Sequence, residues 1–270
     1  MDKSTSMKQI IFKIFNFFGI SIIKTSYLKK LSSVNSSDGQ IFENKNSLIG
    51  NAFNLLKSKG FNPNHVIDIG ANHGTWVREV LHIFPNANYT LVEPQGWLSS
   101  SFADLLENKN FSFLPVGVGK EPGTFIFTIV DRDDSCNFVM TEEDAKKHGF
   151  KQLPIEVKTV NEIVKKSAFG VPDLLKIDAE GLDLEVLEGA TDVLGITDVV
   201  LMEASVVNPH FKNDIKTVIQ YMDEKGYLLF DITDLNRPFE NKVLWLVELL
   251  FIKKTGNFNN IDWISGKPKR

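Results

Sequence analysis

The sequence has very little cysteine: Cys136 is the only one among its 270 residues. A chain with one cysteine cannot form an internal disulfide, which excludes a small secreted domain held together by disulfide bonds. Scarce cysteine is typical of proteins in a reducing compartment, so we expect a cytoplasmic location. Cys136 has no recognisable partner for nucleophilic chemistry, and we interpret it as a structural or surface thiol.

The sequence also lacks an excess of basic residues. Its 34 aspartates and glutamates outnumber its 30 lysines and arginines, and the formal net charge is −4. Without a positive field over the whole chain, nucleic acid is not an expected partner. Internal repeats and low-complexity segments are missing as well. The hydrophobic fraction of 43% is ample for a large core, and the length suits one α/β domain.

A long uncharged apolar run is also missing. A membrane-spanning helix needs about 20 apolar residues, and the nearest candidate, residues 7–23, is shorter and contains two lysines and a glycine. No small-residue cleavage site follows it, as a signal peptide would require. Two interpretations of the N-terminal helix and linker, residues 1–40, stay open. The helix packs on the domain, or it lies on a membrane surface and makes a peripheral contact through residues 8–30.

From residue 41 onward, apolar strands alternate with amphipathic helices. This alternation predicts a mostly parallel, doubly wound α/β sheet with right-handed crossovers. The apolar segment 243–254 is expected to add an antiparallel strand at the end of the sheet. The pattern is interrupted at about 124–154, which we interpret as an insertion or cap over the pocket. The expected parallel strands are 66–69, 89–92, 111–116, 174–177, 199–202 and 227–231.

The most informative segment, residues 66–94, reads VIDIGANHGTWVREVLHIFPNANYTLVEP. A buried strand ends at Asp68, a turn runs from Gly70 to Gly74, a helix follows, and a second strand ends at Glu93. This layout is typical of a nucleotide-type cofactor site, because the turn lets a ligand approach the backbone and the acid can bind ribose hydroxyls. A dinucleotide loop requires the spacing G-x-G-x-x-G. Asn72 occupies the second glycine position, so a nicotinamide cofactor is disfavoured.

A second motif, residues 174–190, reads LLKIDAEGLDLEVLEGA. It is again a buried strand that ends in an acid, Asp178, followed by a turn at Glu180. Ligands of open parallel sheets bind at the carboxyl ends of the strands, so Asp178 should lie on the same edge as Gly70 and Glu93. Lys176 shares one side of its strand with Asp178, and the two could form an ion pair. Capping of the next helix by either acid remains an alternative.

Taken together, D-I-G-A-N-x-G, the V-E-P strand end and the LKIDAEGLDLEVLEGA segment resemble the FkbM family of methyltransferases. The resemblance implies a Rossmann-like class I methyltransferase fold, S-adenosyl-L-methionine as cofactor, and methyl transfer to a hydroxyl of a small-molecule or glycan acceptor. It implies acceptor-side catalytic roles for Asp178 and Glu180. The cofactor-pocket positions that it implies are Asp68, Gly70, Asn72, Gly74 and Glu93.

Three questions remain open at this level. Asp178 is the leading candidate for the base, with Glu180 second, but a neighbouring Lys176 would weaken a carboxylate as a base and favours an orienting role. Mg²⁺ could bind between Asp178 and Glu203, although two carboxylates without a visible third ligand disfavour it. A non-catalytic scaffold that retains the cofactor loop is the alternative function.

Overall fold

The computed structural model describes residues 47–207 and 212–256 of the chain. The chain divides into two units, Met1–Phe42 and Glu43–Arg270, and every described residue belongs to the second. The expected N-terminal helix and linker of residues 1–40, including the proposed membrane contact through residues 8–30, lie outside the described residues.

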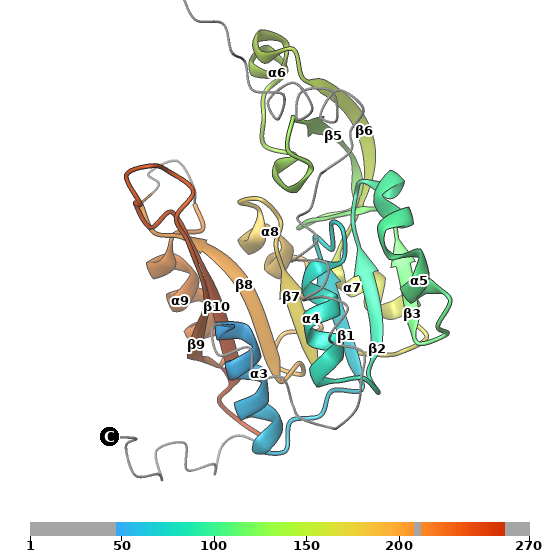
Figure 1. Cartoon of the computed structure of the whole chain (residues 1–270), viewed down its shortest axis with the longest axis vertical. Helices are drawn as coiled ribbons and strands as arrows, with labels where there is room; N and C mark the ends of the chain where they lie inside the picture. Colours follow the sequence, from blue (N-terminus) through green and yellow to red (C-terminus); the bar gives the residue numbers. More distant parts are fainter. Residues whose placement is uncertain (1–46, 208–211, 257–270) are drawn as a thin grey trace, which may run out of the picture. The chain divides into compact units, whose positions relative to one another are not determined.

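A seven-stranded sheet with the order β3-β2-β1-β7-β8-β10-β9 forms the centre of the second unit (Figure 1). Neighbouring strands pair in parallel except where β10 is involved. The chain therefore reverses its direction of winding between β1 and β7, where open α/β sheets bind ligands. The predicted α/β fold with a mostly parallel sheet and an antiparallel C-terminal strand is confirmed. The strands are β1 (His65–Ile69), β2 (Asn88–Val92), β3 (Phe111–Leu114), β7 (Leu174–Ile177), β8 (Val199–Ser205), β9 (Tyr227–Asn236) and β10 (Leu246–Lys253).

Helices cover both faces of this sheet, and each face has its own apolar core. One core joins the sheet to α3 (Leu48–Ser58), α4 (Thr75–Ile83) and α5 (Ala103–Leu106). The other core joins it to α7 (Val160–Lys166), α8 (Asp183–Glu188) and α9 (Ile215–Glu224). Successive side chains of a strand point to opposite faces of the sheet, and helices cover both of these faces. Both sets of side chains in the central strands are therefore buried, and the sequences of these strands are almost continuously apolar.

The position of the C-terminal strand corrects the sequence prediction. Strand β10 is antiparallel as expected, but it lies between β8 and β9, and β9 is the strand at the end of the sheet. The burial of the two strands explains this order. Leu249, Leu250 and Phe251 of β10 are almost completely buried, whereas Leu228 and Leu235 of β9 are exposed. The more apolar strand therefore takes the position that is covered on both faces.

One predicted strand boundary differs from the structure, and the segment after β2 is only partly α-helical. The chain there forms a 3-10 helix, η1 (Gly96–Phe102), followed by the short α5. Serine hydroxyls compete for backbone hydrogen bonds, and the run Ser99–Ser101 weakens the α-helix there. Strand β3 ends before Pro115, which has no N–H to donate to a sheet.

The interruption at residues 124–154 belongs to a second, three-stranded sheet with the order β4-β6-β5. Strand β5 (Gly123–Ile129) pairs in antiparallel fashion with β6 (Lys151–Lys158), and β6 pairs in parallel with β4 (Gly117–Val118). Between β5 and β6 lie the short 3-10 helix η2 (Asp133–Ser135) and the helix α6 (Glu142–His148). We call residues 123–158 the arm; Figure 1 shows it beyond the carboxyl ends of β1, β2 and β7.

Candidate active site

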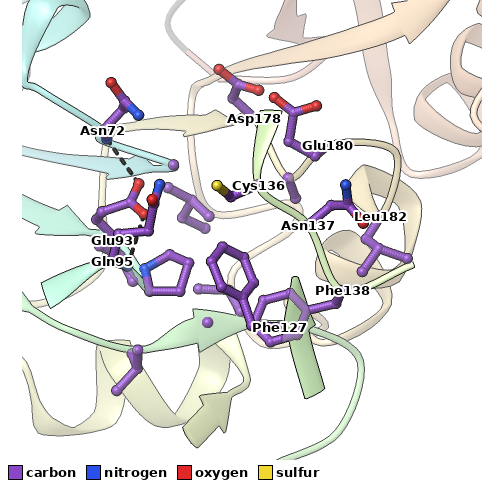
Figure 2. A pocket seen from close by; sticks show the side chains of 18 of the residues that line it. Asn72, Glu93, Gln95, Phe127, Cys136, Asn137, Phe138, Asp178, Glu180 and Leu182 are labelled. Carbon is purple, nitrogen blue, oxygen red and sulfur yellow. Dashed lines mark hydrogen bonds between the residues drawn. The ribbon is translucent and has the colours of Figure 1, made fainter. Parts of the chain in front are cut away.

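A pocket opens between the carboxyl ends of β1, β2 and β7 and the arm (Figure 2). Its lining combines the turn after β1, the turn after β2, the loop after β7 and the segment around η2. The lining side chains that are labelled in the figure are Asn72, Glu93, Gln95, Phe127, Cys136, Asn137, Phe138, Asp178, Glu180 and Leu182.

Glu93 holds the two neighbouring turns of the pocket together. It is 3% exposed, and its two carboxylate oxygens accept hydrogen bonds from the backbone N–H groups of Asn72 and Gln95, each at 2.9 Å. Burial raises the pKa of Glu93, and these backbone bonds oppose the shift because they stabilise the charged form. The sequence placed Glu93 in the cofactor pocket, and the structure places it in the lining.

The turn after β1 requires its first glycine for two independent reasons. Gly70 has φ +74°, a left-handed conformation that L side chains rarely adopt. A Cβ atom on Gly70 would also lie 2.0 Å from the backbone oxygen of Asp178. Asn72 is left-handed as well, with φ +44°, which asparagine tolerates better than most residues. The turn after β1 and the loop after β7 are therefore packed backbone to backbone.

Two of the residues expected in the cofactor pocket do not line it. Gly74 lies at the N-terminal cap of α4 with φ +74°, and a Cβ atom there would meet Phe102 at 3.4 Å. Asp68 is fully buried below the pocket, where its Oδ1 lies 3.2 Å from Nζ of Lys176. Burial raises the pKa of Asp68, and Lys176 opposes that shift. Asp68 thus contributes to the site through its ion pair with Lys176 and does not line the pocket.

Lys176 is a buried cation that lies between Asp68 and Asp178. Its ammonium group lies 3.2 Å from Oδ2 of Asp178 and donates a hydrogen bond of 2.9 Å to the backbone oxygen of Gly70. The structure thus confirms the ion pair expected between Lys176 and Asp178. Burial would lower the pKa of Lys176, but the carboxylates of Asp68 and Asp178 raise it above its usual value. Lys176 therefore stays charged.

Glu180 and Asp183, beyond Asp178, are both shifted toward the neutral form. Burial, followed by the charges of Asp178 and Asp183, raises the pKa of Glu180 to about 8. Glu180 is also held at φ +50°, an uncommon conformation for this residue type. Burial and Asp178 raise the pKa of Asp183 to about 7, and its side chain accepts hydrogen bonds from Ala179 and Asn213. The site thus contains an acid that can change its protonation state near neutral pH.

The sequence predicted a cap over the pocket but did not show which residues of the arm line it. The rings of Phe127 and Phe138 lie 4.7 Å apart at the apolar side of the lining, and Cys136 lies between them and Asp178 in Figure 2. Cys136 is 6% exposed, and burial raises the pKa of its thiol, so it is a structural thiol in the lining. The aromatic and β-branched character of β5 was the available signal.

Hydrogen bonds tie the arm to the body around η2. His73 bonds Oδ2 of Asp133 through Nε2 and Oγ of Ser101 through Nδ1, both at 2.7 Å. The side-chain amide of Gln95 donates to the backbone oxygen of Asp133, also at 2.7 Å. Both ring nitrogens of His73 therefore have partners, and its bond to Asp133 holds the arm next to the turn after β1.

In residues 47–207 and 212–256, no group of three or more His, Cys, Asp or Glu side chains could hold a metal ion. Within the same ranges, no helix combines the length and the apolar character needed to cross a membrane.

Comparisons with known proteins agree with the sequence resemblance. The sequence model of the "Methyltransferase FkbM domain" matches residues 68–229. A search of curated proteins found no match. Among solved structures, the chain is similar to the methyltransferase FkbM from Methylobacillus flagellatus, with 15% identity and a TM-score of 0.48 over 70% of this chain and 43% of that one. This chain thus spans less than half of the Methylobacillus protein.

Two other solved structures are similar over more of their own length. The precorrin-6y C5,15-methyltransferase from Geobacter metallireducens has 12% identity and a TM-score of 0.43, over 76% of this chain and 87% of that one. The ribosomal protein L11 methylase from Lactobacillus delbrueckii has 11% identity and a TM-score of 0.42, over 76% and 77%. Because the family match covers more than half of the sequence and includes both motifs of the pocket, the chain belongs to the FkbM family of methyltransferases.

Proposed function

We propose that the protein is an S-adenosyl-L-methionine-dependent O-methyltransferase that acts on a hydroxyl of a sugar, glycan or natural product. The observation that carries this proposal is the pocket itself. Glu93 and the turn of Gly70 and Asn72 form one part of its lining, and the carboxylates of Asp178 and Glu180 form the adjoining part (Figure 2). A cofactor side and an acidic acceptor side therefore meet in one space.

The residues on the cofactor side suit S-adenosyl-L-methionine. The buried carboxylate of Glu93 can accept hydrogen bonds from ribose hydroxyls, because charged acceptors form the stronger bonds. The side chains of Phe127 and Phe138 offer an apolar surface for a purine ring. The left-handed backbone at Gly70 leaves no Cβ between the turn and a bound ligand. When bound, the cofactor supplies an electrophilic methyl group.

On the acceptor side, the structure supports different roles for the two acids. Asp178 is fixed by Lys176 at 3.2 Å, which suits it to orient the acceptor hydroxyl. The pKa of Glu180, about 8, is close to neutral pH, where a general base works best. We therefore assign proton removal from the hydroxyl to Glu180, and orientation to Asp178. This reverses the order in which sequence reasoning ranked the two residues.

Calorimetry of cofactor binding tests the first half of the proposal. Glu93→Ala removes a charged acceptor whose hydrogen bonds are worth about 1.5–3 kcal/mol each, so affinity for S-adenosyl-L-methionine should fall about tenfold or more. Glu107→Ala is the matched control, because Glu107 is an exposed acid that does not line the pocket. Unchanged affinity in Glu93→Ala, with the fold intact by circular dichroism, would contradict the assignment.

A further inference from the structure

A line of carboxylates extends from the pocket across the edge of the main sheet. Glu203 of β8 is directly opposite Glu248 of β10. The β7–β8 register pairs Ile177 with Met202, so its next step places Asp178 opposite Glu203. Residues opposite each other on neighbouring strands share a face of the sheet. We call Asp178, Glu203 and Glu248 the acidic row.

The acidic row begins at the acceptor side of the pocket and continues beyond it. Asp178 lines the pocket, whereas Glu203 and Glu248 do not. The pocket covers the ends of β1, β2 and β7, and the row continues from Asp178 over β8 and β10. A molecule that occupied the row would therefore meet the cofactor pocket at Asp178, which is the position required of a methyl acceptor.

The acidic row has more carboxyl groups than the described residues pair with cations. Its nearby cation, Lys176, forms ion pairs with Asp68 and Asp178. Among the described residues, neither Glu203 nor Glu248 forms a salt bridge, and Glu248 accepts a 2.6 Å hydrogen bond from the hydroxyl of Thr233. Burial and the charge of Asp178 raise the pKa of Glu203, and burial raises that of Glu248 to about 7. Burial without a counter-charge thus favours the neutral form of both carboxyl groups, and a cationic ligand would stabilise their charged form.

Two polar groups without partners lie on the same face. Ser205 is 0% exposed, and its hydroxyl has no hydrogen-bond partner in the described part of the chain. It is two positions beyond Glu203 on β8 and therefore projects to the same side as the acidic row. The buried indole N–H of Trp76 also lacks a partner in these residues, and the Trp76 ring centroid is 5.9 Å from Nζ of Lys176. Both groups would gain a hydrogen bond from a polar molecule bound at this face.

We propose that the acidic row is an acceptor subsite that binds an acceptor with an ammonium group beside the hydroxyl to be methylated. The proposal rests on the proposed function, because it assigns the acceptor class of the same site. An ammonium group supplies both three hydrogen-bond donors and a positive charge that stabilises the ionised carboxylates, whereas a neutral polyol supplies hydrogen bonds alone. A metal ion is not the favoured occupant, because these carboxylates form no metal-binding group in the described residues.

A matched pair of sugars tests the charge requirement. Glucosamine and N-acetylglucosamine differ in the ammonium group, and both are titrated into the full chain with and without S-adenosylhomocysteine. Glucosamine should bind about tenfold or more tightly than N-acetylglucosamine, because a charge-assisted contact is made by the amine alone. The double variant Glu203→Gln/Glu248→Gln should abolish the difference, and Glu107→Gln should retain it.

The outcomes separate this inference from the proposed function. Equal affinity for the two sugars, no detectable binding of either, or a preference that persists in the double variant would each overturn the subsite. Tight binding of Mg²⁺ that is lost in the double variant would also overturn it, because the row would then be a metal site. A glucosamine preference without any binding of S-adenosylhomocysteine would retain the subsite and refute the proposed function.

Discussion

Replacing Gly70 by alanine should destabilise the protein at the contact on which both halves of the site depend. Gly70 has φ +74°, and the Cβ atom of an alanine would lie 2.0 Å from the backbone oxygen of Asp178. That oxygen belongs to the main chain at the end of β7 and cannot rotate away like a flexible side chain. The turn after β1 or the loop after β7 must therefore move.

The cost has two parts. A left-handed conformation costs an L residue about 1–2 kcal/mol relative to glycine. Forcing extra volume into a packed region typically costs a further 1–3 kcal/mol, about 2–5 kcal/mol in sum. Typical domains are stable by about 5–15 kcal/mol, so Gly70→Ala should remain folded at 25 °C but with a clearly lower unfolding midpoint.

Gly226→Ala is the matched control for this experiment. Gly226 has φ +86°, and no atom lies within 4 Å of the position of an added Cβ. This variant therefore has the backbone cost without the clash. Urea unfolding of both variants should give a difference of about 1–3 kcal/mol, provided that their m-values agree. Equal losses of stability would refute the inference that the two loops are packed backbone to backbone, and unchanged cofactor affinity in Gly70→Ala would weaken the role of this contact in the site.

The remaining predictions concern catalysis, pH and membrane contact. Glu180→Gln should lower kcat by about 10²–10⁴-fold and remove the ionisation near pH 8 from the pH–rate profile. Asp178→Asn should retain this ionisation. An unchanged profile in Glu180→Gln would refute the role of Glu180 as the base. The raised pKa of Glu180 means that, between about pH 4.5 and 8, the folded state keeps a proton that the unfolded chain has released. The free energy of unfolding should therefore fall as pH rises through this range, by at most about 1.4 kcal/mol per pH unit for this group, and urea titrations should show a shallower slope in Glu180→Gln. If residues 8–30 contact anionic bilayers, the full chain should float with liposomes and a chain that begins at Ser36 should not; equal flotation would favour a packing role for this segment.

The sequence by itself determined the fold class and the location of the candidate site. Strand–helix alternation has few solutions, so it predicted a parallel sheet, and acids at strand ends must gather at one edge of such a sheet. The turn at Gly70, the acid Glu93 and the pair Lys176–Asp178 could therefore be assigned before any coordinates. Each of these depends on local geometry and strand alternation, which are encoded within a few neighbouring residues.

The tertiary structure decided what depends on packing between distant segments. The sequence could not show that Asp68 is buried beneath the pocket, because its ion-pair partner, Lys176, lies on another strand that is distant in the sequence. It could not show that β10 inserts between β8 and β9, which brings Glu248 opposite Glu203. The raised pKa of Glu180 likewise arises from burial and from charges that only the folded chain brings together. Strand order and burial are properties of the whole sheet, and they determine which carboxylates can act together.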